Sequence, residues 1–433
     1  MNFISTRNAS PPVGLSDAIA AGLAPDGGLY VPERLPAAFV PPHPPQATLA
    51  ATAEPWLRPF FEGDALAADL SSICAEAFNF PAPLKALSTP GDHVLELFHG
   101  PTAAFKDFGA RFLAASLARL RRGGTQPLTI LVATSGDTGA AVAAAFHRQP
   151  GLRVVVLYPD GRVSPRQAHQ LGCFGDNISA LRVAGSFDDC QALVKRALND
   201  AELQARVPLS SANSISLGRL LPQMSYYADA ASRHHASTGQ PLNFVIPTGN
   251  LGNAMAAILV RALGAPLGRI VLATNANRVL PDFFHGGEYA AAPSVATLAN
   301  AMDVGAPSNF ERLRWLFRGD DQALRDAFTA RSVNDAGIRD TIEHRHARHG
   351  EVFCPHTATA IHVLEQLRAE GADGDWAVAA TAHPAKFESV VEPLIGRTVD
   401  VPPALADLLR RPAHAEPIAP DYAVLRERLA RSD

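Results

Sequence analysis

Lys106 is the residue whose surroundings point most directly to chemistry. The chain of 433 residues has only four lysines, Lys85, Lys106, Lys195 and Lys386. Lys106 stands between Phe105 and Phe108, within the run 99–109. Apolar surroundings disfavour the charged ammonium, so the amine becomes a usable nucleophile. The position predicts a lysine that forms a Schiff base with a carbonyl group.

The turn Pro247–Asn253 is a candidate phosphate site. It follows an expected strand and opens an expected helix, and it contains Gly249 and Gly252. Glycines let the backbone come close to a ligand, and N–H groups at a helix N-terminus can converge on a phosphate. Neither G-x-G-x-x-G nor G-K-[ST] is present. A short phosphate-binding cup is therefore more plausible than a dinucleotide site or a Walker loop.

A second turn of the same kind is Thr134–Gly139, which contains small residues and hydroxyls. Such a turn suits a carboxylate or phosphate, although the charge of Asp137 would repel an anion unless it points elsewhere. An ordinary tight turn, with Asp137 or Thr138 capping the helix, is the alternative. A reactive lysine combined with a phosphate cup is what pyridoxal phosphate requires.

Alternating strands and helices must position these residues. Strands are expected at 128–133, 152–158, 178–183, 243–246 and 269–274, and helices at 107–122, 140–148, 187–198 and 253–263. This alternation predicts an α/β fold with two doubly wound domains of parallel strands, whose ligands bind beyond the carboxyl ends of the strands.

The predicted domain limits follow from this pattern. Residues 1–85 are rich in proline and form an N-terminal accessory layer. Residues 86–235 form a smaller α/β domain with the reactive lysine, 236–400 form a larger cofactor-binding domain, and 401–433 form a C-terminal tail.

The composition excludes several function classes. Hydrophobic residues make up 47% and charged residues 18%, as in a globular enzyme, and the net charge of −4 gives no overall attraction to nucleic acid or membrane. The four cysteines form no C-x-x-C pair. In the segment 343–349 only His346 and His349 share a helix face, and two ligands without a carboxylate partner make a weak site, so no metal is expected. Without a signal-like segment, the interpretation is a cytoplasmic protein, monomeric or homodimeric.

Six segments closely resemble motifs of the threonine synthases, in the same order along the chain. They are residues 99–112, 133–141, 211–215, 247–253, 298–308 and 381–387. The resemblance is to the longer bacterial and fungal type, which carries an extra N-terminal layer. It implies a fold-type II pyridoxal phosphate enzyme, a lyase related to the tryptophan synthase β chain. The implied reaction, the last step of threonine biosynthesis, converts O-phospho-L-homoserine and water to L-threonine and phosphate.

The same resemblance assigns roles to individual residues. Lys106 would be the Schiff-base lysine, and Thr381 would face the pyridine nitrogen with a neutral hydroxyl. Asp137 would lie near the 3-hydroxyl of the cofactor. The cofactor phosphate would be cradled by Gly249, Asn250, Leu251, Gly252 and Asn253.

The substrate phosphate needs donors of its own. Candidates are Ser135, Thr138, Asn213, Ser214, Arg219 and Lys386. For Lys386, substrate contact and structural pairing are both open. The freed amine of Lys106 is the economical choice of general base, since one group can serve more than one proton transfer.

Three other functions compete with this interpretation. A phospho-lyase on the same scaffold would only eliminate phosphate, from O-phosphohomoserine or O-phosphothreonine, and would give 2-oxobutyrate. A dinucleotide-dependent oxidoreductase is disfavoured by the missing glycine motif. A silent homologue acting as a binding module would not need the intact Lys106 and both turns.

Overall fold

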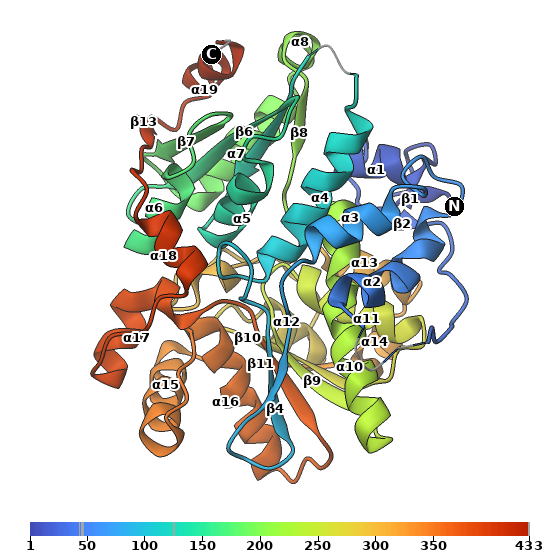
Figure 1. Cartoon of the computed structure of the whole chain (residues 1–433), viewed down its shortest axis with the longest axis vertical. Coiled ribbons are helices and arrows are strands. Elements are labelled where there is room, and N and C mark those ends of the chain that lie inside the picture. The colour runs from blue at the N-terminus through green and yellow to red at the C-terminus, as the bar shows by residue number, and fades with distance from the viewer. Residues whose placement is uncertain (43, 45–46, 124–125, 432–433) are drawn as a thin grey trace.

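Two β-sheets organise the chain in the computed structural model, which describes residues 1–42, 44, 47–123 and 126–431. The five-stranded sheet has the order β13-β7-β6-β5-β8, and all of its pairs are parallel. Its strands are β5 (Leu128–Ala133), β6 (Leu152–Pro159), β7 (Ile178–Val183), β8 (Leu209–Ser211) and β13 (Glu416–Ile418). This sheet forms the upper half of the molecule in Figure 1.

The six-stranded sheet forms the lower half and has the order β11-β10-β9-β12-β4-β3. Its strands are β3 (Leu84–Ala86), β4 (Asp92–Glu96), β9 (Leu242–Pro247), β10 (Leu267–Thr274), β11 (Thr329–Ser332) and β12 (Trp376–Ala380). Only the edge pair β3–β4 is antiparallel. The central strand β12 is buried along its whole length, as expected for a parallel strand covered on both faces.

Two strands pair across the predicted domain limits. Strand β4 lies within the predicted smaller domain of residues 86–235, yet it pairs with β12 in the six-stranded sheet. Strand β13 lies in the predicted tail of residues 401–433, yet it extends the five-stranded sheet beside β7. Both strands join partners that are distant along the chain, and a local sequence pattern does not specify such pairing.

The predicted elements are otherwise confirmed, with shifts at their ends. Strands 128–133 and 178–183 and helix 187–198 are found with the expected limits. The helix expected at 140–148 is α5 (Asp137–Phe146) and begins earlier. The reason is Thr134, whose hydroxyl accepts hydrogen bonds from the Gly136 and Gly139 N–H groups at 3.0 and 2.9 Å and so folds the turn tightly onto the helix.

The N-terminal layer packs against helix α4 (Lys106–Leu120), which is the element that carries the candidate lysine. This layer holds β1 (Phe3–Ser5), α1 (Leu15–Ala21), β2 (Tyr30–Pro32), α2 (Leu49–Leu57) and α3 (Leu70–Ala77) and lies at the right of Figure 1. Phe108 and Phe112 on α4 pack against Phe80 and Phe78, with ring centroids 4.6 and 6.0 Å apart. The phenylalanine stripe of α4 is therefore core packing.

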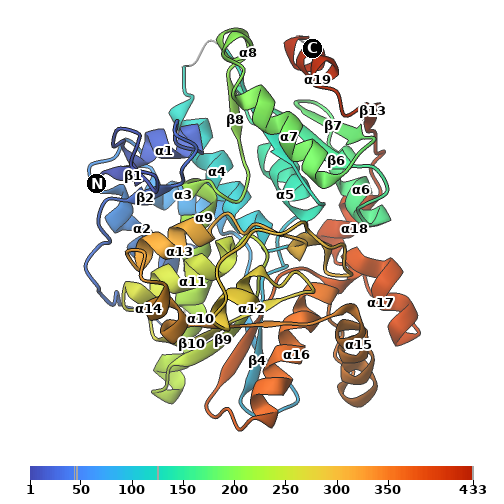
Figure 2. The ribbon, with the colours of Figure 1, turned by 180° about the vertical axis from the view of Figure 1, so that it is seen from behind.

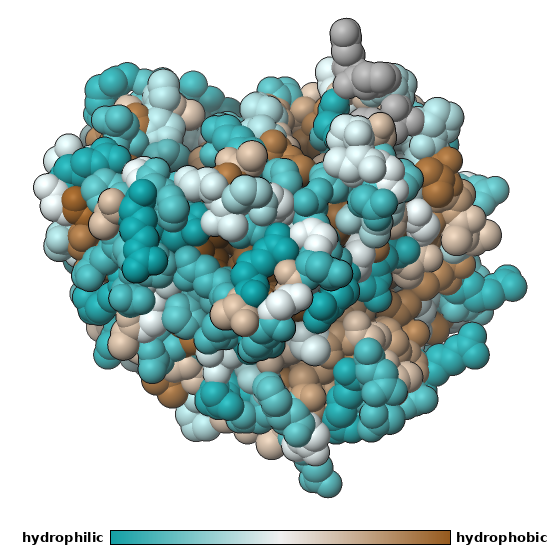
Figure 3. All heavy atoms as spheres, turned by 90° about the horizontal axis from the view of Figure 1, so that it is seen from below, coloured by the Kyte–Doolittle hydropathy of each residue, from teal (hydrophilic) through white to brown (hydrophobic). Residues whose placement is uncertain are grey.

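The surface of the molecule is mostly polar where it is viewed from below, and hydrophobic residues appear between the polar ones in smaller groups (Figure 3). Within the described ranges, no helix combines the length and the hydropathy needed to span a bilayer.

Candidate active site

One cavity collects the candidate residues from both halves of the fold. The residues that line it are Phe105, Lys106, Asp137, Ser214, Arg219, Gln223, Pro247, Thr248, Gly249, Asn250, Leu251, Gly252, Asn253, Ala254, Ala301, Met302, His356 and Thr381. They come from turns at strand ends and helix starts, which is where parallel sheets bind ligands. The cavity thus contains every residue predicted to bind the cofactor.

Lys106 is the first residue of α4, and a short loop fixes this end of the helix. The Phe105 N–H donates to the Thr381 carbonyl at 2.8 Å, and Ala104 forms a bridge with Ala382. The loop is therefore tied to the segment that follows β12. These contacts bring Lys106 and Thr381 to the same cavity, although they are far apart in the sequence.

The amine of Lys106 is perturbed by its environment. Burial in the cavity lowers the pKa of Lys106 to about 8, and the nearby positive charge of Arg219 adds to this effect. The Lys106 Nζ lies 4.7 Å from the centroid of the Phe105 ring. The flanking phenylalanines predicted the direction of this pKa shift, although only Phe105 contacts the amine, while Phe108 packs into the core.

The cup at residues 249–253 connects β9 to helix α11 (Gly252–Ala262). Leu251 has a φ of 63°, in the left-handed region, which turns the chain sharply just before the helix begins. A Cβ on Gly249 would lie 3.0 Å from Met302 Cα, so a glycine is needed for this close approach. The cup is consequently packed tightly against the segment around residue 302.

Two buried donors in the cavity have no hydrogen-bond acceptor among the residues that the structure describes. The Asn253 side chain accepts hydrogen bonds through Oδ1 from Tyr227 and, at 3.3 Å, from Tyr226, and its Nδ2 has no acceptor. Arg219 donates through Nη1 to the Ala212 carbonyl at 2.7 Å, and its Nε has no acceptor. Buried donors are normally paired, so both atoms suit a ligand that brings acceptor oxygens. The cavity therefore fits a phosphorylated group such as pyridoxal phosphate.

Asp137 and Lys386 form an ion pair beside the cavity. Lys386 Nζ lies 2.8 Å from Asp137 Oδ1 and also donates to the Thr102 carbonyl at 2.7 Å, and its side chain is completely buried. Burial alone would raise the pKa of Asp137, but the charge and hydrogen bond of Lys386 outweigh burial and lower it. Lys386 thus neutralises the charge that would otherwise repel an anion.

The predicted substrate residues divide into two groups. Ser214 and Arg219 line the cavity, and burial lowers the pKa of Arg219 to about 10. Ser135, Thr138, Asn213 and Lys386, all in the described part of the chain, are not among the lining residues. The structure therefore brings only Ser214 and Arg219 directly to the cavity wall.

Known protein families match the chain over nearly its whole length. Residues 93–383 match the family described as pyridoxal-phosphate dependent enzyme, residues 2–78 the threonine synthase N terminus, and residues 357–428 the threonine synthase C-terminal family. The threonine synthase of Haemophilus influenzae is 38% identical over 433 residues, which cover 100% of both chains. The chain belongs to the threonine synthase family.

Solved structures agree with this family membership. The threonine synthase of Escherichia coli superposes with a TM-score of 0.89 at 36% identity, and the alignment covers 99% of each chain. The pyridoxal phosphate-bound threonine synthase of Brucella melitensis gives a TM-score of 0.88 at 32% identity, again over 99% of each chain. The predicted fold class, the lyase assignment and the pyridoxal phosphate cofactor are confirmed, and the phospho-lyase alternative is not favoured.

His356 and Gln223 also line the threonine synthase cavity, and neither was predicted from the sequence. The His356 Nε2 accepts a hydrogen bond from the Ala301 N–H at 3.1 Å, and burial lowers the pKa of His356 to about 4, so the ring is neutral at pH 7. Pro355, at the first position of helix α16 (Pro355–Ala369), was a readable helix-start signal. Gln223 is the last residue of the short 3-10 turn Leu221–Gln223, in a hydrophobic stretch.

Proposed function

We propose that this chain makes L-threonine and inorganic phosphate from O-phospho-L-homoserine and water, with Lys106 as the group that moves protons. The observation that carries this proposal is the composition of the cavity. An amine with a pKa of about 8, a glycine cup and two buried donors without an acceptor among the described residues, Asn253 Nδ2 and Arg219 Nε, all line it. The family membership favours this reaction over elimination alone, because the full-length relatives are threonine synthases.

Lys106, the cup at residues 249–253 and Thr381 would hold the cofactor, with Asp137 beside it. The lysine amine would bind the carbonyl carbon, the cup would accept the phosphate, and the Thr381 hydroxyl would face the pyridine nitrogen. Bound pyridoxal phosphate supplies an electron sink for charge that develops on the substrate carbons. The Lys386 partner of Asp137 keeps the local charge balanced for an anionic cofactor.

The Lys106 amine is suited to proton transfer, because a group with a pKa near the working pH can both accept and return a proton. In the proposed reaction, Lys106 Nζ takes protons from the α-carbon and then the β-carbon of the substrate. The bond between the γ-carbon and the phosphate oxygen breaks and releases phosphate, and the γ-carbon gains a proton to become a methyl group. The oxygen of water then bonds to the β-carbon, one proton of the water goes to the released phosphate, and the α-carbon regains a proton.

Arg219 and Ser214 are the proposed donors to the phosphate of the substrate. Both line the cavity, and Arg219 Nε is a buried donor without a protein acceptor. Charged donors held in a buried site bind phosphate strongly. Ser135, Thr138 and Asn213 remain candidates only by motif, and the contacts of Lys386 with Asp137 and Thr102 favour structural pairing over substrate contact.

The partner of the site is a small-molecule substrate. We further propose a cytoplasmic enzyme that is a monomer or a homodimer and has no nucleic-acid or membrane partner. Support for the location comes from the cysteines, because all four are free and buried, as in proteins kept in a reducing compartment. Cell fractionation and light scattering would test these points.

Product analysis tests the proposed function. Purified protein with pyridoxal phosphate and O-phospho-L-homoserine should release threonine and phosphate in equal amounts. The Lys106→Ala variant should lose at least about 1,000-fold in turnover, since it removes both the nucleophile and the proton carrier. Release of 2-oxobutyrate in place of threonine would show that water is not added back and would establish the phospho-lyase instead.

A further inference from the structure

Arg312 is a buried arginine whose partners are all uncharged. It lies on helix α13 (Phe310–Leu316), and its side chain is 1% exposed. In the part of the chain that the structure describes, no carboxylate lies within ion-pair distance of it. A buried charge without a counter-ion is expensive unless each donor is satisfied. Three polar atoms satisfy Arg312, and each belongs to a different segment of the chain.

The first two partners are backbone carbonyls. Arg312 donates to the Tyr30 carbonyl through Nε at 3.1 Å and through Nη2 at 3.0 Å, and to the Ile215 carbonyl through Nη2 at 2.7 Å. Tyr30 belongs to β2 of the N-terminal layer, which lies beside α13 in Figure 2. Ile215 follows the cavity-lining Ser214. Arg312 thus joins the N-terminal layer to the wall of the cavity.

The third partner leads to the cup. Arg312 Nη1 donates to Asn309 Oδ1 at 2.7 Å, and Asn309 Nδ2 donates in turn to the Asn250 carbonyl at 2.8 Å. A Cβ on Gly252 would lie 3.5 Å from both Asn309 Nδ2 and the Ser214 carbonyl oxygen. The Asn309 amide therefore stands beside the first residue of α11, where the cup ends. The guanidinium of Arg312 is rigid and planar, so its contacts fix the position of Asn309 relative to Tyr30 and Ile215.

We propose that Arg312 and Asn309 form a clasp that holds the cup at residues 249–253 in the shape required to bind the cofactor phosphate. Both are positioning residues, since neither lines the cavity. The inference rests on the proposed function in one respect, namely that this cup receives the phosphate. It extends that function by giving the N-terminal layer a role in phosphate binding, through Tyr30.

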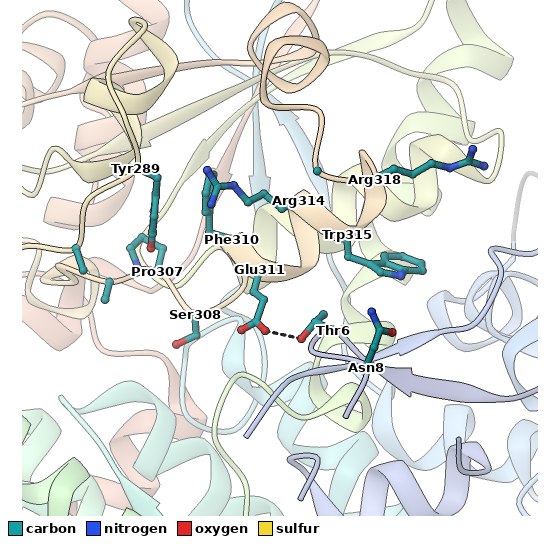
Figure 4. Close-up of a pocket in the computed structure, with 13 residues that line it drawn as sticks. Thr6, Asn8, Tyr289, Pro307, Ser308, Phe310, Glu311, Arg314, Trp315 and Arg318 are labelled. Atoms are coloured by element: carbon teal, nitrogen blue, oxygen red, sulfur yellow. Dashed lines mark hydrogen bonds between the residues drawn. The ribbon is translucent and has the colours of Figure 1, made fainter. Parts of the chain in front are cut away.

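Glu311, next to Arg312 on the same helix, offers a matched comparison. Its carboxylate accepts a hydrogen bond from Thr6 at 2.7 Å and lies 3.3 Å from Arg7 Nε, so it also contacts the N-terminal layer. Glu311, Trp315 and Arg318 line a groove of about 720 Å³. Figure 4 shows the Glu311 side chain pointing toward Thr6. Glu311 anchors the same layer to α13 without contacting the cup.

The test compares two ligands that differ only in the phosphate. Full-length protein freed of cofactor is titrated with pyridoxal phosphate and with pyridoxal, and the dissociation constants are measured by absorbance for Arg312→Lys, Asn309→Ala and Glu311→Gln. We expect the first two variants to weaken pyridoxal phosphate binding about tenfold, or about 1.4 kcal/mol, without changing pyridoxal binding. Glu311→Gln should change neither constant.

An equal loss of affinity for pyridoxal phosphate and for pyridoxal would overturn the clasp, because general destabilisation of the protein weakens the binding of both ligands at Lys106 alike. Unchanged pyridoxal phosphate binding in both variants would overturn it as well. If Arg312→Lys fails to give a cooperative thermal transition, Asn309→Ala carries the test. Gly252→Asp separates the two proposals by placing a carboxylate in the cup. Normal pyridoxal phosphate binding in Gly252→Asp would refute the cup itself, whereas a loss there together with normal Arg312 and Asn309 variants would refute only the clasp.

Discussion

Lys106 and Lys386 are the two lysines that lie in chemical motifs, and their charge environments in the fold are opposite. Lys386 is fully buried with a carboxylate 2.8 Å away, so its charge is compensated. Lys106 lines the cavity, and burial, together with the positive charge of Arg219, lowers its pKa to about 8. Among the described residues, no carboxylate lies within ion-pair distance of Lys106.

The difference shows how one site can hold a stable charge and a reactive amine together. A lysine whose charge is paired with an aspartate serves the structure. A lysine that is desolvated near other cations gives up its proton and becomes available for chemistry. Asp137 accounts for this difference, because it lies on the cavity wall and forms its ion pair with Lys386.

The largest effect on stability is expected from Lys386→Met. Removing one partner of a buried ion pair typically costs about 3–5 kcal/mol, since the other charge remains buried. Urea unfolding should show this loss in the free energy of unfolding. The matched control is Lys85→Met, which removes the ion pair between the exposed Lys85 and Glu96 and should cost about 1 kcal/mol or less.

The double variant Asp137→Asn/Lys386→Met sharpens this prediction. If the two residues act as a pair, the double variant should be less destabilised than the sum of the single variants. Additive losses would contradict the pairing and would reopen substrate contact as the role of Lys386.

A smaller change in the free energy of unfolding is expected when the pH is varied. The pKa of Lys106 is lowered from 10.5 to about 8 in the folded protein, so between these values the unfolded chain binds more protons. Stability of the cofactor-free protein should therefore rise with pH across this window, and the cost of the buried charge should be fully present below pH 8. The difference in unfolding free energy between the native chain and Lys106→Met isolates this contribution. A flat difference from pH 8 to 10 would show that Lys106 is not perturbed.

The sequence predicted most of the fold because the strands carry strong local signals. Strand β5 is six consecutive buried residues, and its limits were found directly. Strand β4 falls within the predicted domain of residues 86–235 but pairs with β12 in the six-stranded sheet, and a local pattern does not specify pairing between such distant segments. Helix α5 began earlier than expected because a single hydroxyl, that of Thr134, organises its first turn.

The candidate site was predictable where the residue type carries the chemistry. Lys106 and the glycine cup stand out by composition and spacing. The Asp137–Lys386 pair could not be found in this way, because two charged residues that are distant in sequence give no sign that they meet. His356 was missed for a similar reason, since its contact with Ala301 exists only after two separate segments fold together.

The central claim is that Lys106, and no other lysine, is the reactive amine of the cavity. Borohydride reduction of the protein loaded with pyridoxal phosphate, followed by peptide mapping, tests it most directly. The account predicts that the reduced cofactor is found on Lys106 and that Lys106→Ala carries none. Labelling of Lys386, Lys85 or Lys195 in the native chain would contradict the account.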